Sequence, residues 1–315
     1  MKLSIIIPCY NVEHFLGDTV NSIINQTDSL EYEVIAVDDG SRDNTYEVAK
    51  DVLKPIKNHL VISKSNGGVS SARNEGLRHA SGEYVYFLDG DDILASSFFV
   101  QLNKRNFSSD VIYWNYFHER NAEITRQVIL HSSQNPALEY LVGKLPIHMG
   151  SILFKRKMLS ECHMLFDETT AYAEDREFIV KSLFYAKSYH FIDELLFTYK
   201  WRMGSAMRVQ NQYTEKQFSG LRCAIRIYEF FSNQDDKNTQ YASLNNLCIS
   251  LLVHKRKVMN IPEDQYHKII DDYIARYLPR SRFSLKSKFT LFVSIGKIIF
   301  FIDKRLLAKF IKVVF

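Results

Sequence analysis

Three acidic side chains that could bind a metal ion follow directly after an apolar run that ends at residue 88. Residues 83–88 are rich in aromatic and branched side chains and have glycine on both sides, which predicts a short β-strand. Asp89, Asp91 and Asp92 stand at its carboxyl end. Hard carboxylate oxygens in that position suit Mg²⁺ or Mn²⁺ carrying a phosphorylated ligand. A solvated acidic turn is the alternative interpretation, so the neighbouring segments must decide between the two.

The first 105 residues alternate short, continuous apolar runs with amphipathic segments. The runs 3–8, 33–37, 60–62 and 84–88 predict strands, and segments at about 12–25, 44–53, 70–79 and 96–104 predict helices. This alternation is typical of β-α-β units, so we expect an α/β fold with a mostly parallel sheet and helices on both faces. Ligands of such sheets bind at the carboxyl ends of the strands.

Polar or acidic groups follow each of these four strands. They are residues 8–11 (Pro-Cys-Tyr-Asn), 38–41 (Asp-Asp-Gly-Ser), 66–68 (Asn-Gly-Gly) and 89–92 (Asp-Gly-Asp-Asp). Each alone is ordinary turn chemistry, but four in succession converge on one crevice. The glycine pair would let the backbone approach a ligand, and the helix that follows carries Arg73, which together favour an anion such as a diphosphate. A G-x-G-x-x-G fingerprint is absent, which argues against a dinucleotide-binding dehydrogenase.

In order and spacing, these segments resemble the motif series of the family 2 glycosyltransferases. The matching stretches are 4–11 (SIIIPCYN), 37–45 (VDDGSRDNT), 66–76 (NGGVSSARNEG) and 88–92 (LDGDD). The resemblance implies the GT-A fold and the transfer, with inversion, of a sugar from a UDP-sugar or another NDP-sugar. It covers the first 105 residues closely and about the next hundred more loosely.

Residue by residue, the resemblance implies a donor site. Asp39 would read the base, because a carboxylate can accept the imide N–H of uracil. Pro8 and Tyr10 would line the base and ribose pocket. Arg73 would hold the nucleotide near its pyrophosphate or base.

The acidic turn matches the family's D-x-D motif. By that match Asp91 is the metal ligand, Asp89 lies nearer the ribose, and the Mn²⁺ or Mg²⁺ neutralises the leaving diphosphate. Asp92 is expected to cap the following helix or to shape the turn. Three histidines are candidates for a further ligand, and none is assigned: His148, His163 and His190.

A general base is expected in the less regular part of the chain, where 111–117, 123–130 and 147–154 predict strands that extend the sheet. Glu174 and Asp175 open a predicted helix that runs to about residue 186 and resemble the family's E-D motif. By that match Asp175 takes the proton of the acceptor hydroxyl. The alternative is that acids in a first helical turn complement the helix dipole.

A further donor contact is implied in the stretch 198–205, which resembles the family's segment after a late strand. Arg202 would approach the diphosphate there. A surface arginine at a strand end is the alternative.

The basic charge of the chain is concentrated near its carboxyl end. Residues 276–315 hold ten Lys or Arg and one acid, a net charge of +9, which leaves −5 for residues 1–275 of a chain with net charge +4. The segments 213–231, 239–258 and 263–277 predict helices, and 283–315 predicts a basic amphipathic end. Such a helix suits an anionic membrane surface, or docks on its own domain with a solvated basic face. Nucleic acid is not expected as a partner, because no nucleic-acid motif accompanies the charge.

Composition is compatible with this interpretation. A chain of 315 residues that is 46% apolar predicts a folded protein. The four cysteines are scattered and form no C-x-x-C pair, which favours a reduced, cytoplasmic chain. No segment approaches the roughly 18 apolar residues that span a bilayer, so we expect a peripheral protein on the inner face of the membrane.

The predicted organisation is a GT-A domain over 1–205, with a donor half (1–105) and an acceptor half (106–205), and a helical region over 206–315. The expected function is transfer of a sugar from a nucleotide-sugar donor to a glycan or lipid-linked acceptor in polysaccharide assembly. Two alternatives remain open. A nucleotidyltransferase would carry a glycine-rich triphosphate loop where residues 8–11 stand, and a non-catalytic sugar-binding scaffold would hydrolyse no donor.

Overall fold

The computed structural model describes residues 2–104, 108–120, 123–129, 134–201, 214–258, 265–281 and 311. Its chain divides into two compact units. The first comprises 1–136, 145–168 and 178–208, and the second comprises 137–144, 169–177 and 209–315. The predicted boundary at residue 205 falls in the segment 202–213, outside the described residues.

The donor half folds as the alternating pattern predicts. Its four strands are parallel neighbours in the order β3-β2-β1-β4, with β1 Lys2–Cys9, β2 Glu31–Asp38, β3 His59–Ser63 and β4 Tyr84–Phe87. The helices between them are α1 Leu16–Ile24, α2 Thr45–Val52 and α3 Val69–His79. The sequence predicted each of these seven elements to within a few residues.

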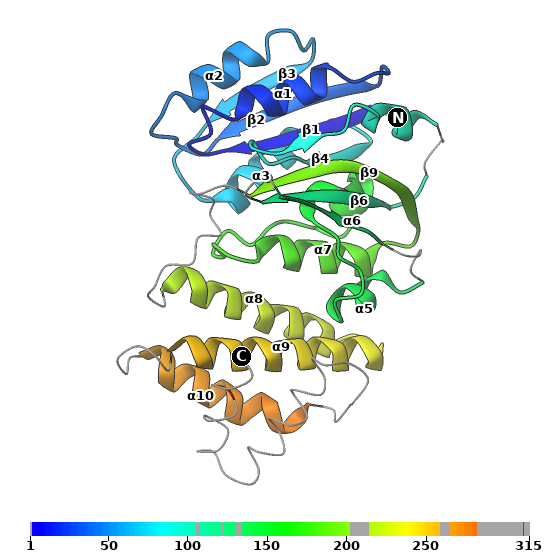
Figure 1. The fold of residues 1–315 in the computed structure, drawn as a ribbon. Helices are drawn as coiled ribbons and strands as arrows, with labels where there is room; N and C mark the ends of the chain where they lie inside the picture. Colours follow the sequence, from blue (N-terminus) through cyan, green and yellow to red (C-terminus); the bar gives the residue numbers. More distant parts are fainter. Residues whose placement is uncertain are drawn as a thin grey trace. The chain divides into compact units, whose positions relative to one another are not determined.

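Helices cover both faces of this parallel sheet (Figure 1). The chain moves outward from β1 to β3 through α1 and α2, then returns to β4 through α3, so right-handed crossovers put α3 on the opposite face. At Gly76, α3 approaches β1 so closely that an added Cβ would lie 2.3 Å from Ile6 Cγ2. Glycine is therefore required where α3 packs on β1.

The rest of the sheet is mixed. β8 Ile152–Lys155 is antiparallel to both β4 and β6 Val111–Arg120, and β6 is parallel to β9 Tyr189–Trp201. β5 Ile93–Leu94 pairs antiparallel with β9, and β7 Glu123–Gln127 pairs antiparallel with β6. Short helices complete this part of the chain: α4 Phe98–Asn103, α5 Pro136–Leu141 and α6 Arg156–Glu161.

Three expectations for this region were wrong in detail. The predicted strand 147–154 begins only at Ile152, because Met149–Ser151 forms a 3₁₀ turn capped by His148. The predicted strand 123–130 ends at Gln127. Residues 198–201 lie within β9 instead of following a strand, since tertiary pairing with β6 and β5 extends β9 to 13 residues.

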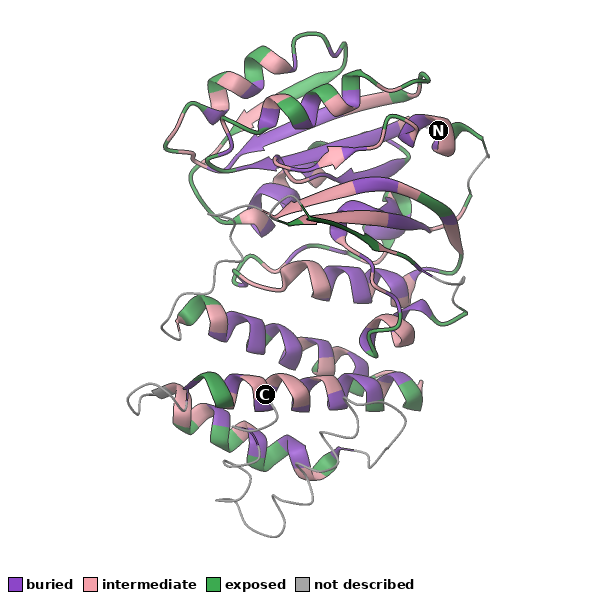
Figure 2. Cartoon of the chain, viewed as in Figure 1, coloured by how far each residue is buried: buried purple, intermediate pink, exposed green. Residues whose placement is uncertain are grey.

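The core of the first unit lies between the central strands and the helices that cover them. Figure 2 shows β1 and β4 as buried and β3 as mostly exposed or half-buried, as expected for an edge strand. Tyr86, Phe98 and Trp114 pack with ring centroids 5.3–5.7 Å apart and join the parallel strands to β6. This packing fixes the strand ends that carry the candidate site.

The second unit is helical. It contains α8 Glu215–Ser232, α9 Lys237–Val258 and α10 Gln265–Tyr277, followed by the short 3₁₀ turn Leu278–Arg280. Leu221, Leu247, Leu251 and Ile270 are completely buried in its core. The predicted helical region after the sheet is confirmed.

One further helix, α7 Glu174–Tyr185, begins in the second unit and ends in the first. The predicted amphipathic end 283–315 lies outside the described residues except for Ile311, which is buried in the core of the second unit. No described helix combines the length and the apolar character that crossing a bilayer requires.

Candidate active site

The polar segments after β1, β2 and β4 meet at the carboxyl edge of the parallel sheet. The Asp39 N–H donates to the Cys9 carbonyl at 2.9 Å, and the Leu88 N–H donates to the Ile6 carbonyl at 3.0 Å. Pro8 is buried opposite Val37, whereas Tyr10, just beyond β1, is 43% exposed. The strand ends therefore form one surface, with a tyrosine ring at its rim.

Asp39 is buried beneath this edge and organises the loop after β3. Its Oδ1 accepts from the Lys64 ammonium at 2.8 Å and from the Gly67 N–H at 3.0 Å, and its Oδ2 accepts from the Gly68 N–H at 2.7 Å. The exposed fraction of Asp39 is 2%. Both glycine amides thus bind Asp39, and the expectation that the glycine pair lets the backbone approach a diphosphate stays a prediction.

The loop after β2 also approaches the loop after β3 at Gly40. Gly40 has φ +69°, and an added Cβ would lie 2.8 Å from the Asn66 nitrogen. The Asn66 side-chain amide donates to the Asp39 carbonyl at 2.8 Å. A side chain at Gly40 would therefore separate two backbones that this site holds together.

Arg73 connects α3 to the acidic turn. Its Nη2 donates to Asp89 Oδ1 at 2.9 Å, and its guanidinium lies 5.3 Å from the centre of the Phe166 ring. The Arg73 side chain is 4% exposed and that of Asp89 is 31% exposed. The structure thus brings Asp39, Arg73 and Asp89 together through the start of α3.

The electrostatics of the edge keep Asp89 ionised. Burial disfavours its charged form, but the Arg73 guanidinium, through its charge and its hydrogen bond, and the His148 ring outweigh burial and lower the pKa of Asp89. Burial, reinforced by Asp38, Asp89 and Asp91, raises the pKa of the Cys9 thiol, which therefore stays neutral. The carboxylates of Asp38, Asp89 and Asp91 are therefore all close enough to the Cys9 thiol to affect its ionisation.

Of the two roles expected for Asp92, capping the following helix or shaping the turn, its observed hydrogen bond fits the second. Asp92 is 1% exposed, and its Oδ1 accepts from the backbone N–H of Lys200 at 2.9 Å. This bond ties the acidic turn to β9 at the place where β5 pairs with β9. Asp92 therefore holds the turn in position, which agrees with the second expectation, that it shapes the turn.

The donor atoms of the acidic turn fit a hard divalent cation. Asp91 is half-buried at the sheet edge, and Asp89 is half-buried beside it. Within the described ranges no group of three or more His, Cys, Asp or Glu residues could by itself hold a metal ion. One or two carboxylates, with substrate phosphates and water completing the shell, is the way proteins commonly bind Mg²⁺.

Two further predicted residues, Asp175 and Arg202, are not among the described residues that form the bonded series from Asp39 to Asp89. Asp175 is half-buried in the first turn of α7, in the second unit, and its Oδ1 accepts from the Arg176 backbone N–H at 2.7 Å. Arg202 lies outside the described residues. The roles of both stay predictions.

Three neighbours of the site were not assigned from the sequence. Lys64 follows β3 directly, so its strand-end position was the available signal. Phe166 is distant in sequence from the other site residues, and no sequence pattern pointed to it. His148 was considered only as a metal ligand, whereas its Nδ1 accepts from the Gly150 N–H at 3.1 Å and its ring lies 4.7 Å from that of Tyr199.

The sequence of the chain is similar to a known protein family and to individual proteins of Bacillus subtilis. Residues 4–159 match the family model described as glycosyl transferase family 2. The chain is 29% identical over 283 residues to the uncharacterized glycosyltransferase EpsJ of Bacillus subtilis (strain 168), which covers 85% of this chain and 82% of EpsJ. It is 27% identical over 287 residues to the minor teichoic acid biosynthesis protein GgaB of the same strain, covering 85% of this chain but 31% of GgaB.

A solved structure shares the fold. Residues 1–349 of TarS from S. aureus, in complex with UDP-GlcNAc, superpose with a TM-score of 0.70 at 20% identity, over 98% of this chain and 91% of that one. The predicted GT-A class is confirmed by this likeness, and at this identity the likeness concerns the fold alone.

Proposed function

The chain belongs to glycosyl transferase family 2, and on that premise we propose that it transfers a sugar, with inversion, from a UDP-sugar or another NDP-sugar to an acceptor hydroxyl. The observation that carries this proposal is the bonded series that runs from Asp39 through the glycine pair to α3, Arg73 and Asp89. It joins Asp39, Arg73 and Asp89 along one sheet edge, where Asp39 would read the base, Arg73 would supply a cation and the acidic turn would bind the metal.

The nucleotide would bind along this edge. Asp39 Oδ2 accepts one hydrogen bond among the described residues, so a second lone pair is available for the imide N–H of uracil. The exposed Tyr10 ring would offer a face for the base, and Pro8 would line the same pocket. Arg73 would contribute positive charge toward the nucleotide, held in place by Asp89 and by the Phe166 ring.

The metal would be Mn²⁺ or Mg²⁺, held by Asp91 with Asp89 nearby. When bound it supplies positive charge that stabilises the departing diphosphate. Arg73 is nearly buried and would add a fixed charge to the same end of the donor.

The acceptor is proposed to react by single displacement. The acceptor oxygen forms a bond to the anomeric carbon, the bond from that carbon to the diphosphate oxygen breaks, and the hydroxyl proton passes to Asp175. The name of GgaB, a teichoic acid biosynthesis protein, supports a glycan or lipid-linked acceptor in cell-surface polysaccharide assembly.

A donor screen tests the function. UDP-sugars with Mn²⁺ should raise the melting temperature, because a ligand at 100 times its dissociation constant adds about 2.7 kcal/mol of stability. The same donors should be hydrolysed slowly to UDP in a metal-dependent manner. Stabilisation without hydrolysis or transfer for any donor would favour a binding scaffold, whereas turnover of a nucleoside triphosphate would favour a nucleotidyltransferase.

We also propose that the basic residues of 276–315 attract the protein to anionic lipid on the cytoplasmic side of the membrane. Because Ile311 is buried in the second unit, the attraction would come mainly from charge. The full chain should sediment with phosphatidylglycerol vesicles and not with phosphatidylcholine vesicles, and replacing Lys304, Arg305, Lys309 and Lys312 by Gln should weaken this binding, each charge contributing about 1 kcal/mol. Equal binding by both proteins would contradict it.

A further inference from the structure

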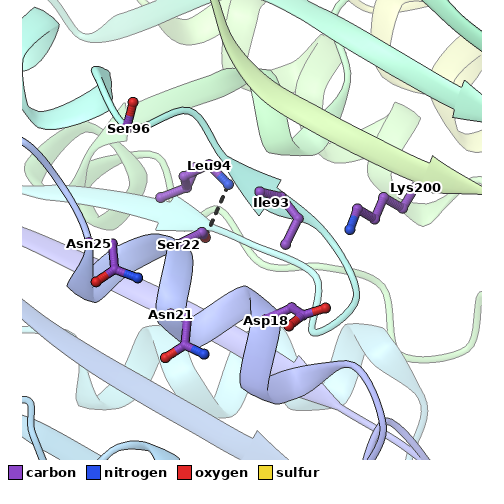
Figure 3. Close-up of a pocket in the computed structure, with 8 residues that line it drawn as sticks. All are labelled: Asp18, Asn21, Ser22, Asn25, Ile93, Leu94, Ser96 and Lys200. Atoms are coloured by element: carbon purple, nitrogen blue, oxygen red, sulfur yellow. Dashed lines mark hydrogen bonds between the residues drawn. The ribbon is translucent and has the colours of Figure 1, made fainter.

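A cavity of about 340 Å³ lies between α1 and β5, and none of the described residues assigned to the donor lines it. Asp18, Asn21, Ser22 and Asn25 line it from α1, at a spacing that puts them along one face of the helix. Figure 3 shows Ile93 and Leu94 across from this face and the Lys200 side chain extending toward Ile93 from β9. Its volume falls in the range of small-molecule sites.

Hydrogen bonds between α1 and the β5 segment hold the walls of this cavity. The Leu94 N–H donates to Ser22 Oγ at 3.1 Å, drawn as the dashed line in Figure 3. The Gln26 side chain donates to the Ala95 carbonyl at 2.9 Å, and the Thr27 N–H donates to the Ser96 carbonyl at 3.1 Å. The cavity is therefore formed before any ligand arrives.

The polar groups around it are available to a ligand. Asp18, Asn21 and Asn25 are exposed, and neither their side chains nor that of Lys200 hydrogen-bonds to any described residue. Amides and a carboxylate can each bind two neighbouring hydroxyl groups, while the ammonium donates only. The charges of Asp18 and Lys200 offset one another, which favours a neutral polyhydroxylated ligand over an anion.

A second cavity, of about 350 Å³, shares Ile93 and Lys200 with the first. Phe117 and Ile124 give it a more apolar lining, and Ile124 is 62% exposed. Sugars present C–H faces as well as hydroxyl edges, so adjoining polar and apolar cavities suit successive units of one chain. The two cavities together would therefore hold two successive sugar units.

The shared wall is bonded to the acidic turn. Ile93 directly follows Asp92, and the Lys200 backbone N–H binds the Asp92 carboxylate. A glycan in these cavities would therefore lie beside the turn that carries Asp91. We propose that the two cavities form a subsite that binds a neutral glycan. The bound glycan would be a part of the acceptor chain that is distant from its reacting hydroxyl. This acceptor role rests on the proposed glycosyltransferase function, although the binding itself does not.

The test uses the full chain without a donor. Saturation-transfer NMR is recorded with maltotetraose, cellotetraose and chitotetraose, for the wild type and for an Asn21→Ala/Asn25→Ala variant. The expected loss of affinity is about tenfold, as for the removal of two neutral hydrogen bonds. Both asparagines are exposed, and Asn58→Ala is a matched control because Asn58 is exposed at the opposite end of the sheet, before β3.

A tetrasaccharide signal that the wild type and Asn58→Ala share, and that the double variant loses, supports the subsite. No signal for any of the three glycans, or equal signals in all proteins, would overturn it. A parallel titration with UDP and Mn²⁺ keeps the two proposals apart. UDP binding without glycan binding removes the subsite alone, and glycan binding without UDP binding counts against the donor site alone.

Discussion

Replacing Asp175 by Asn should abolish sugar transfer while leaving UDP binding nearly unchanged. The amide keeps the size of the carboxylate but cannot take the proton of the acceptor hydroxyl, and a positioned general base typically contributes about 10²–10⁴ in rate. Asp175 lies in the second unit, whereas the bonded series from Asp39 to Asp89 lies in the first. We therefore expect kcat to fall and the dissociation constant of UDP, measured by calorimetry, to stay the same.

Glu174→Gln is the matched control, because Glu174 precedes Asp175 in the same first turn of α7. If the two acids only complement the helix dipole, both variants should lose similar, small amounts of stability, about 0.3–1 kcal/mol, and keep their activity. Full turnover by Asp175→Asn would remove this residue from the role of base. Equal loss of turnover in both variants would point to the helix start instead of to one proton acceptor.

Arg73→Met should impair both folding and donor binding. The variant leaves the half-buried Asp89 without its guanidinium partner beside other carboxylates, and leaving such a group without its partner costs about 1–3 kcal/mol. UDP affinity should fall as well if, as proposed, the Arg73 guanidinium supplies positive charge to the diphosphate. Urea unfolding and UDP calorimetry measure the two effects separately.

The matched control is Arg78→Met on the same helix. Arg78 pairs with Glu75 at the surface, where an ion pair contributes about 0–1 kcal/mol, so neither stability nor UDP affinity should change much. Arg73→Lys adds a second probe, since lysine keeps the charge but loses the planar guanidinium that lies on Phe166. If Arg73→Met binds UDP as tightly as the wild type, Arg73 is a structural residue and not a donor contact.

The donor half of the fold could be predicted because its signals are local. Continuous apolar runs mark the buried parallel strands, and turn residues mark their ends, so 3–8 and 84–88 were found almost at their observed bounds. The mixed part of the sheet could not be predicted from such local signals. β5 has two residues and is defined by its pairing with β9, and β9 extends through half-exposed residues because β6 lies beside it.

The same distinction applies to the candidate site. The strand ends predicted that the loops bearing Asp39, Arg73 and Asp91 would meet, and the structure joins Asp39, Arg73 and Asp89, two residues before Asp91, in one bonded series. Which partner each of these groups binds depends on tertiary contacts, and no local sequence pattern reveals those contacts. Thus both glycine amides bind Asp39, and Asp92 binds a backbone N–H that is 108 residues away.

Crystals grown with UDP and Mn²⁺ test the donor site most directly. Anomalous scattering should place the manganese within about 2.2 Å of an Asp91 oxygen, the distance of an oxygen ligand to such an ion. The uracil should lie against Tyr10 with its imide N–H on Asp39, and the diphosphate between the manganese and Arg73. A nucleotide bound elsewhere, or a manganese ion that contacts neither Asp89 nor Asp91, would contradict the assignment of this sheet edge as the donor site.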